Sequence, residues 1–347
     1  MVEKISFASD YEEGAHPAII KNLERTNFFK TAGYGTDEFS ESARQKIRKA
    51  CNAPNAEIFF LVGGTQTNAV VIGALLKSYE GVIAADSGHI SIHEAGAIEF
   101  GGHKVLTLPH HAGKILAGDV KAFVENFFAD GNREHMVFPG MVYISQPTEY
   151  GTLYTLNELK ALNKICREKN LSLYVDGARL AYALASDKND VTLENLAELC
   201  DTFYIGGTKC GAYFGEAVVL KKNLVPHFFT IIKQRGALLA KGRILGVQFD
   251  TLFNDDLYFK IGRRAIDAAE KIRNELKHLG CKLFLDAPTN QIFVVVSDAQ
   301  LKILSERVEF SFWEKISVDK TVIRLATSWA TREEDVNKLL EELRRLI

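Results

Sequence analysis

A lysine in an unusual setting is the first residue of this sequence that could do chemistry. Lys209 stands in the segment 206–211 (GGTKCG), directly after the apolar residues 202–205. Long cationic side chains are rarely buried without a partner, and glycines on both sides leave room for a planar ligand. Lys209 is therefore either an ordinary loop lysine or an amine that desolvation keeps neutral, able to bind an aldehyde cofactor as a Schiff base.

A second segment has the composition of a phosphate-binding turn. Residues 63–68 (GGTQTN) stand where the apolar run 57–62 passes into an apolar helical pattern. Free backbone N–H groups at a helix start bind anions, and Thr65 and Thr67 add hydroxyl groups. The segment matches neither the P-loop nor G-x-G-x-x-G, so a packing role remains the alternative.

A carboxylate stands at another expected strand end. Asp176 closes the apolar run 173–176 and is followed by Gly177-Ala178-Arg179. Ligands of α/β proteins bind at the carboxyl ends of strands, and a carboxylate there can pair with the protonated pyridine nitrogen of a cofactor. A turn aspartate bonded to its own backbone is the alternative.

His89 follows a further apolar run, 82–85, and offers an aromatic ring that could stack on a planar cofactor. His89 and His93 are also spaced i,i+4, as two metal ligands on one helical face would be. Glu94 follows the second histidine and does not occupy the position of the H-E-x-x-H motif. We therefore favour stacking and predict no metal site.

These strand ends carry a phosphate-type turn, a carboxylate and a lysine in one chain. On these residues the sequence resembles the fold-type I pyridoxal-phosphate enzymes and, within them, the threonine aldolase group of the β-eliminating lyase family. The D-G-A-R and T-K-x-G elements are fairly specific in combination. The segments behind the resemblance span nearly the whole chain: 9–10, 34–35, 64–68, 88–89, 94–96, 175–179, 208–211 and 322–327.

The resemblance implies roles for individual residues. Lys209 would hold pyridoxal 5'-phosphate as a Schiff base, Asp176 would pair with the pyridine nitrogen, and His89 would stack on the ring. Guanidinium forks suit a planar carboxylate. The other implied cofactor contacts are Gly64, Thr65, Gln66, Arg179, Thr208 and Lys241, and the implied substrate contacts are Ser9, Tyr34, Arg179 and Arg324.

The implied reaction cleaves a β-hydroxy-α-amino acid, such as threonine, allo-threonine or phenylserine, to glycine and an aldehyde. β-Elimination and transamination on the same scaffold are alternatives. A ligand-sensing module without turnover is disfavoured, because the sequence attaches no DNA-binding helix pair or basic segment.

The sequence departs from the better-known branch of the family in two places. Where that branch has a histidine near the β-hydroxyl, segment 145–151 has Glu149, which can act as a general base if its pKa is raised. The family's arginine segment that crosses to the partner's phosphate appears as 237–242, so Lys241 would supply that charge. With Tyr34 and Arg243 it would reach a neighbouring subunit, which implies a homodimer or homotetramer with shared sites.

The elements that must position these residues alternate along the chain. We expect strands at 57–62, 82–85, 104–108, 141–145, 171–175, 202–205 and 217–220, with helices at 39–50, 69–76, 92–99, 120–128, 156–169 and 193–199. This alternation is typical of a mostly parallel sheet covered on both faces.

Beyond residue 225 the pattern changes to long helices, 241–253, 258–279 and 332–346, and short strands, 282–285, 292–297 and 322–327. We therefore expect an α/β protein of fold type I. A large domain with a seven-stranded-type sheet would cover 31–245 and a small α+β domain 246–347, with the segment 1–30 packing on the domains or a partner.

Composition limits the remaining classes of function. The chain of 347 residues is too long for one ordinary core, and its formal net charge of −2 indicates neither a nucleic-acid nor an anionic-membrane partner. No apolar stretch reaches the roughly 18 residues of a membrane helix. The five scattered cysteines contain no C-x-x-C pair and are predicted to be reduced packing residues. We expect a cytoplasmic enzyme acting on a small amino acid.

Overall fold

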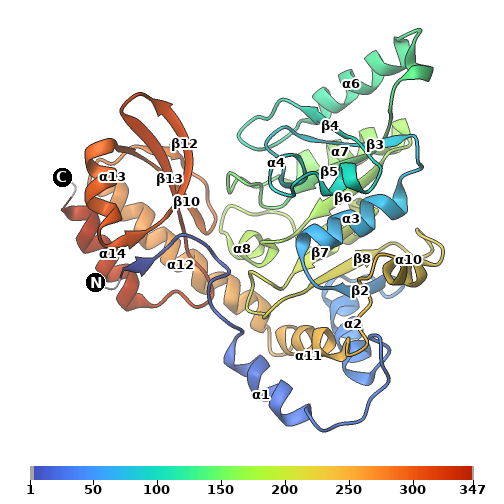
Figure 1. The fold of residues 1–347 in the computed structure, drawn as a ribbon, viewed down its shortest axis with the longest axis horizontal. Helices are drawn as coiled ribbons and strands as arrows, with labels where there is room; N and C mark the ends of the chain where they lie inside the picture. Colours follow the sequence, from blue (N-terminus) through green and yellow to red (C-terminus); the bar gives the residue numbers. More distant parts are fainter. Residues whose placement is uncertain (1–3, 346–347) are drawn as a thin grey trace.

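A seven-stranded sheet forms the centre of the larger part of the molecule in the computed structural model, which describes residues 4–345 (Figure 1). Its strand order is β2-β8-β7-β6-β5-β3-β4, and only β8 runs antiparallel to its neighbours. The expected mostly parallel sheet is therefore confirmed. The strands are β2 (Glu57–Leu61), β3 (Glu80–Ala85), β4 (Val105–Leu108), β5 (Phe138–Ser145), β6 (Ser172–Asp176), β7 (Thr202–Gly206) and β8 (Glu216–Leu220).

Helices cover both faces of this sheet because successive strand side chains point to opposite sides. Val82 and Ile83, neighbours in β3, belong to two different buried clusters. One face packs against α2 (Glu38–Ala50), α6 (Ala117–Ala129), α7 (Leu156–Lys169), α8 (Leu180–Ala185), α9 (Leu193–Leu199) and α11 (Arg243–Leu252). The other packs against α3 (Gly64–Leu75), α4 (His89–Ile92), α5 (Ala97–Phe100) and α10 (Phe228–Gln234).

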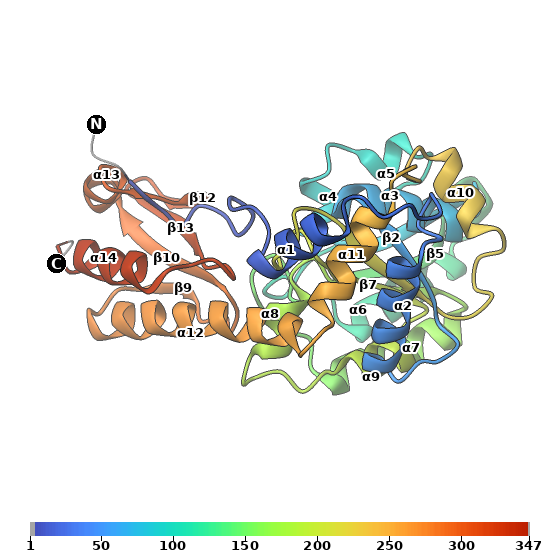
Figure 2. The same ribbon diagram turned by 90° about the horizontal axis from the view of Figure 1, so that it is seen from below.

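The smaller part is built on an antiparallel sheet with the order β12-β13-β10-β9. Figure 2 shows the long helix α12 (Leu257–His278) running from the larger part along this sheet. A third buried cluster joins α12 and α14 (Glu333–Arg344) to the sheet. The strands are β9 (Leu283–Leu285), β10 (Gln291–Ser297), β12 (Ser311–Ser317) and β13 (Lys320–Ala326), and α13 (Asp298–Ser305) follows β10.

The N-terminal segment touches both parts. Strand β1 (Ile5–Ser6) pairs in parallel with β11 (Val308–Glu309) of the smaller part, and α1 (Pro17–Thr26) packs on α11 of the larger part. The residues between them, including Ser9 and Asp10, are thereby held at the junction. The division of the chain near residue 245 stays a proposal; it falls inside α11, which packs on α2.

The expected helix over 92–99 is wrong. The chain forms two single turns, α4 and α5, because Ala95 and Gly96 between them have φ angles of 50° and 72°. Positive φ interrupts a right-handed helix. His93 consequently ends α4.

Within residues 4–345, no helix has the length and hydropathy needed to cross a membrane.

Candidate active site

A cavity of about 210 Å³ lies where the parallel strands of the seven-stranded sheet end. Asp176 ends β6, Ser145 ends β5, and Lys209 follows β7, so the sheet brings these side chains to one edge. The cavity is lined by Tyr11, Gly64, Thr65, His89, Ser145, Pro147, Glu149, Asp176, Ala178, Arg179, Tyr204, Thr208, Lys209 and Glu216. Eight of the predicted site residues thus share one cavity: Gly64, Thr65, His89, Glu149, Asp176, Arg179, Thr208 and Lys209.

Lys209 reaches this cavity from a turn that glycines make possible. The chain at Gly206 and Gly207 passes so close to Ala178 and Gly215 that a Cβ would lie 2.3 and 2.6 Å from backbone oxygens. Burial and the nearby Arg179 lower the pKa of Lys209, while Asp10, Asp176 and Glu216 oppose the shift. A lowered pKa raises the neutral fraction of the amine, which is the form that attacks an aldehyde.

Asp176 is held ionised by four hydrogen-bond donors. Its Oδ2 accepts from the Tyr143 hydroxyl at 2.6 Å and from Asn68 Nδ2 at 3.1 Å, and its Oδ1 accepts from the Tyr204 hydroxyl and the Ala178 N–H. Burial alone would raise the pKa of Asp176, but His89 and the hydrogen bonds from the two tyrosines outweigh it and lower the pKa. A buried anion so placed can stabilise a protonated ring nitrogen.

The buried carboxylate of Glu94 orients the ring of His89. Its Nδ1 donates to Glu94 Oε1 at 2.7 Å, and Asn68 Nδ2 donates to the same oxygen at 2.7 Å. Tyr174 donates to Asn68 Oδ1 at 2.7 Å, which fixes the amide with its nitrogen toward the two carboxylates. Asn68 therefore links the ring that would stack on a cofactor to the carboxylate that would bind its nitrogen.

The predicted phosphate turn opens helix α3. Gly63 is its N-cap and has no side-chain cap, so backbone N–H groups of the first turn remain free for an anion. A Cβ at Gly64 would lie 3.1 Å from the Tyr204 hydroxyl. Thr65 is exposed to the cavity, whereas Gln66 turns back, its Oε1 accepting from the Val62 N–H at 3.3 Å.

Glu149 enters the cavity beside His89. Its Oε1 accepts from the His89 N–H at 3.0 Å and from the Ser145 hydroxyl at 2.8 Å. Burial raises the pKa of Glu149, and the hydrogen bond from Ser145 offsets part of the rise. Its raised pKa suits a carboxylate that must exchange a proton near neutral pH.

The two predicted carboxylate-binding arginines have different partners. Arg179 is clamped by Asp10, whose oxygens accept from Nε at 2.6 Å and Nη2 at 3.0 Å. Arg324 donates from its Nη atoms to Gln291, Ala8 and Ser311, each at 3.1 Å. Among residues 4–345, Arg324 Nε and the Ser9 hydroxyl are buried without a hydrogen-bond partner, so both groups retain hydrogen-bonding capacity for a ligand. Neither residue is among those that line the cavity.

Tyr34 and Lys241 lie outside this cavity. The Tyr34 N–H donates to Ala240 at 3.1 Å, and Lys233 Nζ stands 4.4 Å from the centre of the Tyr34 ring. Both Tyr34 and Lys241 are exposed, and Arg243 is bonded to the carbonyl of Phe29. In a single chain these residues do not reach Lys209.

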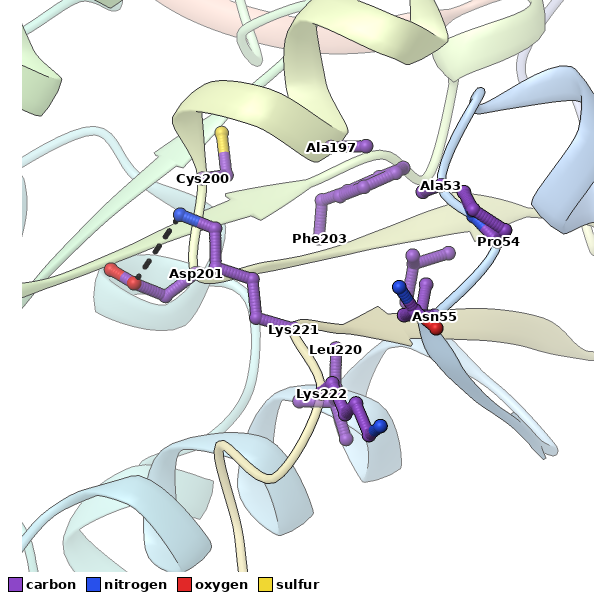
Figure 3. A pocket seen from close by; sticks show the side chains of 12 residues that line it. Ala53, Pro54, Asn55, Ala197, Cys200, Asp201, Phe203, Leu220, Lys221 and Lys222 are labelled. Carbon is purple, nitrogen blue, oxygen red and sulfur yellow. Dashed lines mark ion pairs between the residues drawn. The ribbon is translucent and has the colours of Figure 1, made fainter.

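A second cavity, of about 200 Å³, lies at the other end of β7, next to Cys200 and Phe203 (Figure 3). Its acidic side chain, Asp201, is already engaged by Arg167, by the Leu173 N–H at 2.8 Å and by Lys221 at 3.8 Å. Its lining includes none of the predicted site residues. Among the described residues, no group of three His, Cys, Asp or Glu side chains stands ready to hold a metal ion.

The family model of the β-eliminating lyases matches residues 7–299. The chain belongs to this family. It is 29% identical over 345 residues to a low-specificity L-threonine aldolase of a Pseudomonas strain, covering 98% of this chain and 97% of that one. The solved structure of Leishmania major threonine aldolase superposes with a TM-score of 0.95 at 41% identity, covering 98% and 99% of the two chains.

The fold extends to more distant enzymes. Aspartate aminotransferase of Thermus thermophilus superposes with a TM-score of 0.74 at 17% identity, covering 100% of this chain and 92% of that one, which shows the fold-type I architecture alone. The chain is a pyridoxal-phosphate-dependent lyase. The cavity fits that cofactor, since it offers a buried amine, an ionised carboxylate, an imidazole ring and a free helix N-terminus.

Sequence reasoning assigned no role to several residues of this site. Asn68, Glu94, Tyr143, Tyr204 and Glu216 are buried polar residues that hold the predicted ones. Glu94 and Asn68 lay in segments that carried the family resemblance, which was the available signal. Tyr143 and Tyr204 offered no such signal, because an aromatic residue in a strand is normally interpreted as part of the hydrophobic core.

Proposed function

We propose that this enzyme cleaves a β-hydroxy-α-amino acid, with threonine as the first candidate, to glycine and an aldehyde. The observation that carries the proposal is one cavity in which Glu149, a buried carboxylate whose pKa is raised by burial, lies beside His89, Asp176 and Lys209. The named relatives are threonine aldolases, which favours this reaction over elimination or transamination.

Bound pyridoxal phosphate supplies an electron sink conjugated to the amino acid's α-carbon. The protein supplies position and protons. The phosphate is bound by the N–H groups at the start of α3 together with Thr65 and Thr208. Asp176 keeps the ring nitrogen protonated, and His89 fixes the plane of the ring. Gln66 supports this turn through Val62 rather than from within the cavity.

The substrate carboxylate binds at the junction of the two parts of the molecule. Arg324 Nε and the Ser9 hydroxyl are donors there without a hydrogen-bond partner among residues 4–345, and Arg179 adds its charge while Asp10 holds it in place. A fixed carboxylate decides which bond of the α-carbon aligns with the electron sink. Glu149 then accepts the proton of the β-hydroxyl as the carbon–carbon bond breaks and the aldehyde leaves, and the α-carbon takes up a proton to give glycine.

The products test this proposal. The purified enzyme is incubated with L-threonine, L-allo-threonine and phenylserine, and glycine and the matching aldehyde are quantified. Equal amounts of both are expected, and Lys209→Ala serves as the inactive control. Formation of 2-oxo acids without glycine would exclude the aldolase reaction and favour elimination.

We further propose a cytoplasmic homodimer or homotetramer in which Tyr34 and Lys241 complete the partner's site. Both are exposed and remote from Lys209 in one chain. Mixing inactive Lys209→Ala with a Lys241→Ala protein of low activity should restore activity, because one site of each hybrid holds both lysines. Absence of any recovery in mixtures shown to exchange subunits would contradict shared sites.

A further inference from the structure

Glu216 is a buried acid in the cofactor cavity for which the proposed reaction has no use. It begins β8, is 3% exposed, and lies opposite Gly206 in the register with β7. It lines the cavity together with Thr208 and Lys209. An ionised carboxylate here would stand close to the cofactor's phosphate, and two anions in a site of low dielectric repel each other.

The hydrogen bonds of Glu216 centre on Thr208. Oε1 lies 2.7 Å from Thr208 Oγ1, and Oε2 accepts from the Gly207 N–H at 3.0 Å. Thr208 Oγ1 also accepts from the Gly215 N–H at 3.0 Å. A hydroxyl has one hydrogen and two lone pairs. When Glu216 is ionised, Thr208 must donate its only hydrogen to Oε1 and has none left for a phosphate.

Protonation of Glu216 reverses this bond. A proton on Oε1 donates to the second lone pair of Thr208 Oγ1, so the Thr208 hydrogen is released toward the cavity. Oε2 cannot take that proton to the same effect, because it faces the Gly207 N–H. One proton therefore removes a negative charge and creates a hydrogen-bond donor at the same place.

The surroundings of Glu216 favour the neutral form. Burial raises its pKa to about 8, against hydrogen bonds from Thr208 and Gly207 and the charge of Lys209, with Asp176 adding to the rise. Tyr174, Tyr204 and Tyr258 also face it, and their own pKa values are raised, chiefly by burial and in part by Glu216. Lys209 is thus the nearby cation and Asp176 the nearby anion.

We propose that Glu216 is a positioning residue that is protonated when the cofactor is bound and thereby turns the Thr208 hydroxyl to the cofactor's phosphate. The inference rests on the cofactor assignment, not on the aldolase reaction. Deprotonation of Glu216 withdraws the Thr208 donor and restores a charge beside the phosphate, so phosphate binding weakens at high pH.

A comparison of two ligands isolates the contribution of the phosphate group to binding. The dissociation constants of pyridoxal phosphate and of pyridoxal are measured between pH 6 and 10 with protein from which the cofactor has been removed. Both ligands carry the aldehyde and the ring nitrogen. The titrations of Lys209 and Asp176 therefore affect both dissociation constants alike and cancel in the ratio of the two constants. The preference for the phosphate form should change little near pH 7, where the second ionisation of the phosphate, with a pKa of about 6, is largely complete. It should fall up to about tenfold per pH unit above pH 8, the linkage slope of one proton.

Glu216→Gln mimics the neutral acid at every pH. Its amide nitrogen donates to Thr208 Oγ1 and its oxygen accepts from Gly207, so the preference for pyridoxal phosphate should equal that of the wild type at pH 7 and no longer fall at pH 9. Thr208→Val is the matched variant without the donor. It should bind pyridoxal phosphate about 10-fold more weakly at pH 7, and its affinity for pyridoxal should fall less than its affinity for pyridoxal phosphate.

The outcomes separate this inference from the cofactor assignment. If neither ligand binds the wild-type protein, the cofactor assignment is wrong. If pyridoxal phosphate binds but its preference over pyridoxal does not change with pH, or Glu216→Gln keeps the wild-type pH dependence, the proton-linked role of Glu216 is wrong. The wild-type measurement alone decides this even if a variant does not fold.

Discussion

The cofactor side and the substrate side of the cavity are built differently. On the cofactor side, Asp176 is bonded to four donors that come from the seven-stranded sheet, from α3 and from the turn after β6. On the substrate side, Arg324 comes from β13 and Ser9 from the N-terminal segment, and each keeps a buried polar atom without a partner.

The bonding of Asp176 indicates that this carboxylate is in place before a substrate arrives, although Glu94 Oε2 behind His89 is itself buried with no hydrogen-bond partner among residues 4–345. A fully bonded carboxylate inside one sheet is rigid and needs no rearrangement when charge develops. Buried groups without partners cost free energy that a ligand can recover by bonding them. Variants of the cofactor side should therefore change cofactor binding and chemistry, whereas those of the substrate side should change substrate affinity.

Lys209→Ala gives the largest expected effect on the cofactor side. It removes the amine that holds the cofactor covalently, so activity should fall about 10³-fold or more, and the protein should lose the visible absorbance that the wild type shows with pyridoxal phosphate. Spectra and glycine formation are measured side by side. Retention of the absorbance band would place the covalent bond on another residue.

Glu149→Gln comes next, because it removes the proposed base while preserving shape. The value of kcat should fall about 10²-fold. In the wild type, kcat should rise with pH through a pKa above the usual carboxyl range, since burial raises the pKa of Glu149 and only the ionised form accepts a proton.

Ser145→Ala is the control for that assignment. The Ser145 hydrogen bond lowers the pKa of Glu149, so its loss should move the rising limb of the pH profile to higher pH without abolishing it. An unchanged limb in Ser145→Ala or Glu149→Gln would transfer the role of base to another group.

Arg324→Lys tests the substrate side. Lysine keeps the charge but loses the fork and the Nε donor, so KM for threonine should rise about 10-fold or more, while the dissociation constant of pyridoxal phosphate stays the same. Steady-state kinetics and cofactor titration separate the two. An equal rise in KM for threonine and in the dissociation constant of pyridoxal phosphate would contradict the proposed division between the two sides.

Glu216→Gln gives the smallest effect, and one on stability. The unfolded acid titrates near 4.5 and the folded one near 8, so between these values the folded state binds more protons and its stability falls as pH rises. The glutamine variant avoids this loss, so its stability relative to the wild type should be higher at pH 8 than at pH 4. Unfolding in urea at both pH values measures it.

The parts of the site that follow strands directly were predictable from the sequence. Lys209, Asp176 and Thr65 stand within a few residues of apolar runs whose ends must meet at one edge of a parallel sheet. Local spacing therefore sufficed to bring them together, and the resemblance added their roles.

Contacts between distant segments were not predictable. The clamp between Asp10 and Arg179 joins residues 169 apart, and no local pattern reports such a pair. Strand β12 was missed because its side chains are mostly exposed or half-buried and it lies at the edge of its sheet, so it lacks an apolar run. The break between α4 and α5 depends on the positive φ of Ala95. An alanine gives no indication of a positive φ in the sequence.

Reduction with borohydride identifies the lysine that binds the cofactor. The wild-type protein is mixed with pyridoxal phosphate, reduced, digested and examined by mass spectrometry. One modified lysine is expected, Lys209, in the peptide that carries Thr208 and Cys210. Modification of a different lysine, or of none, would contradict this expectation.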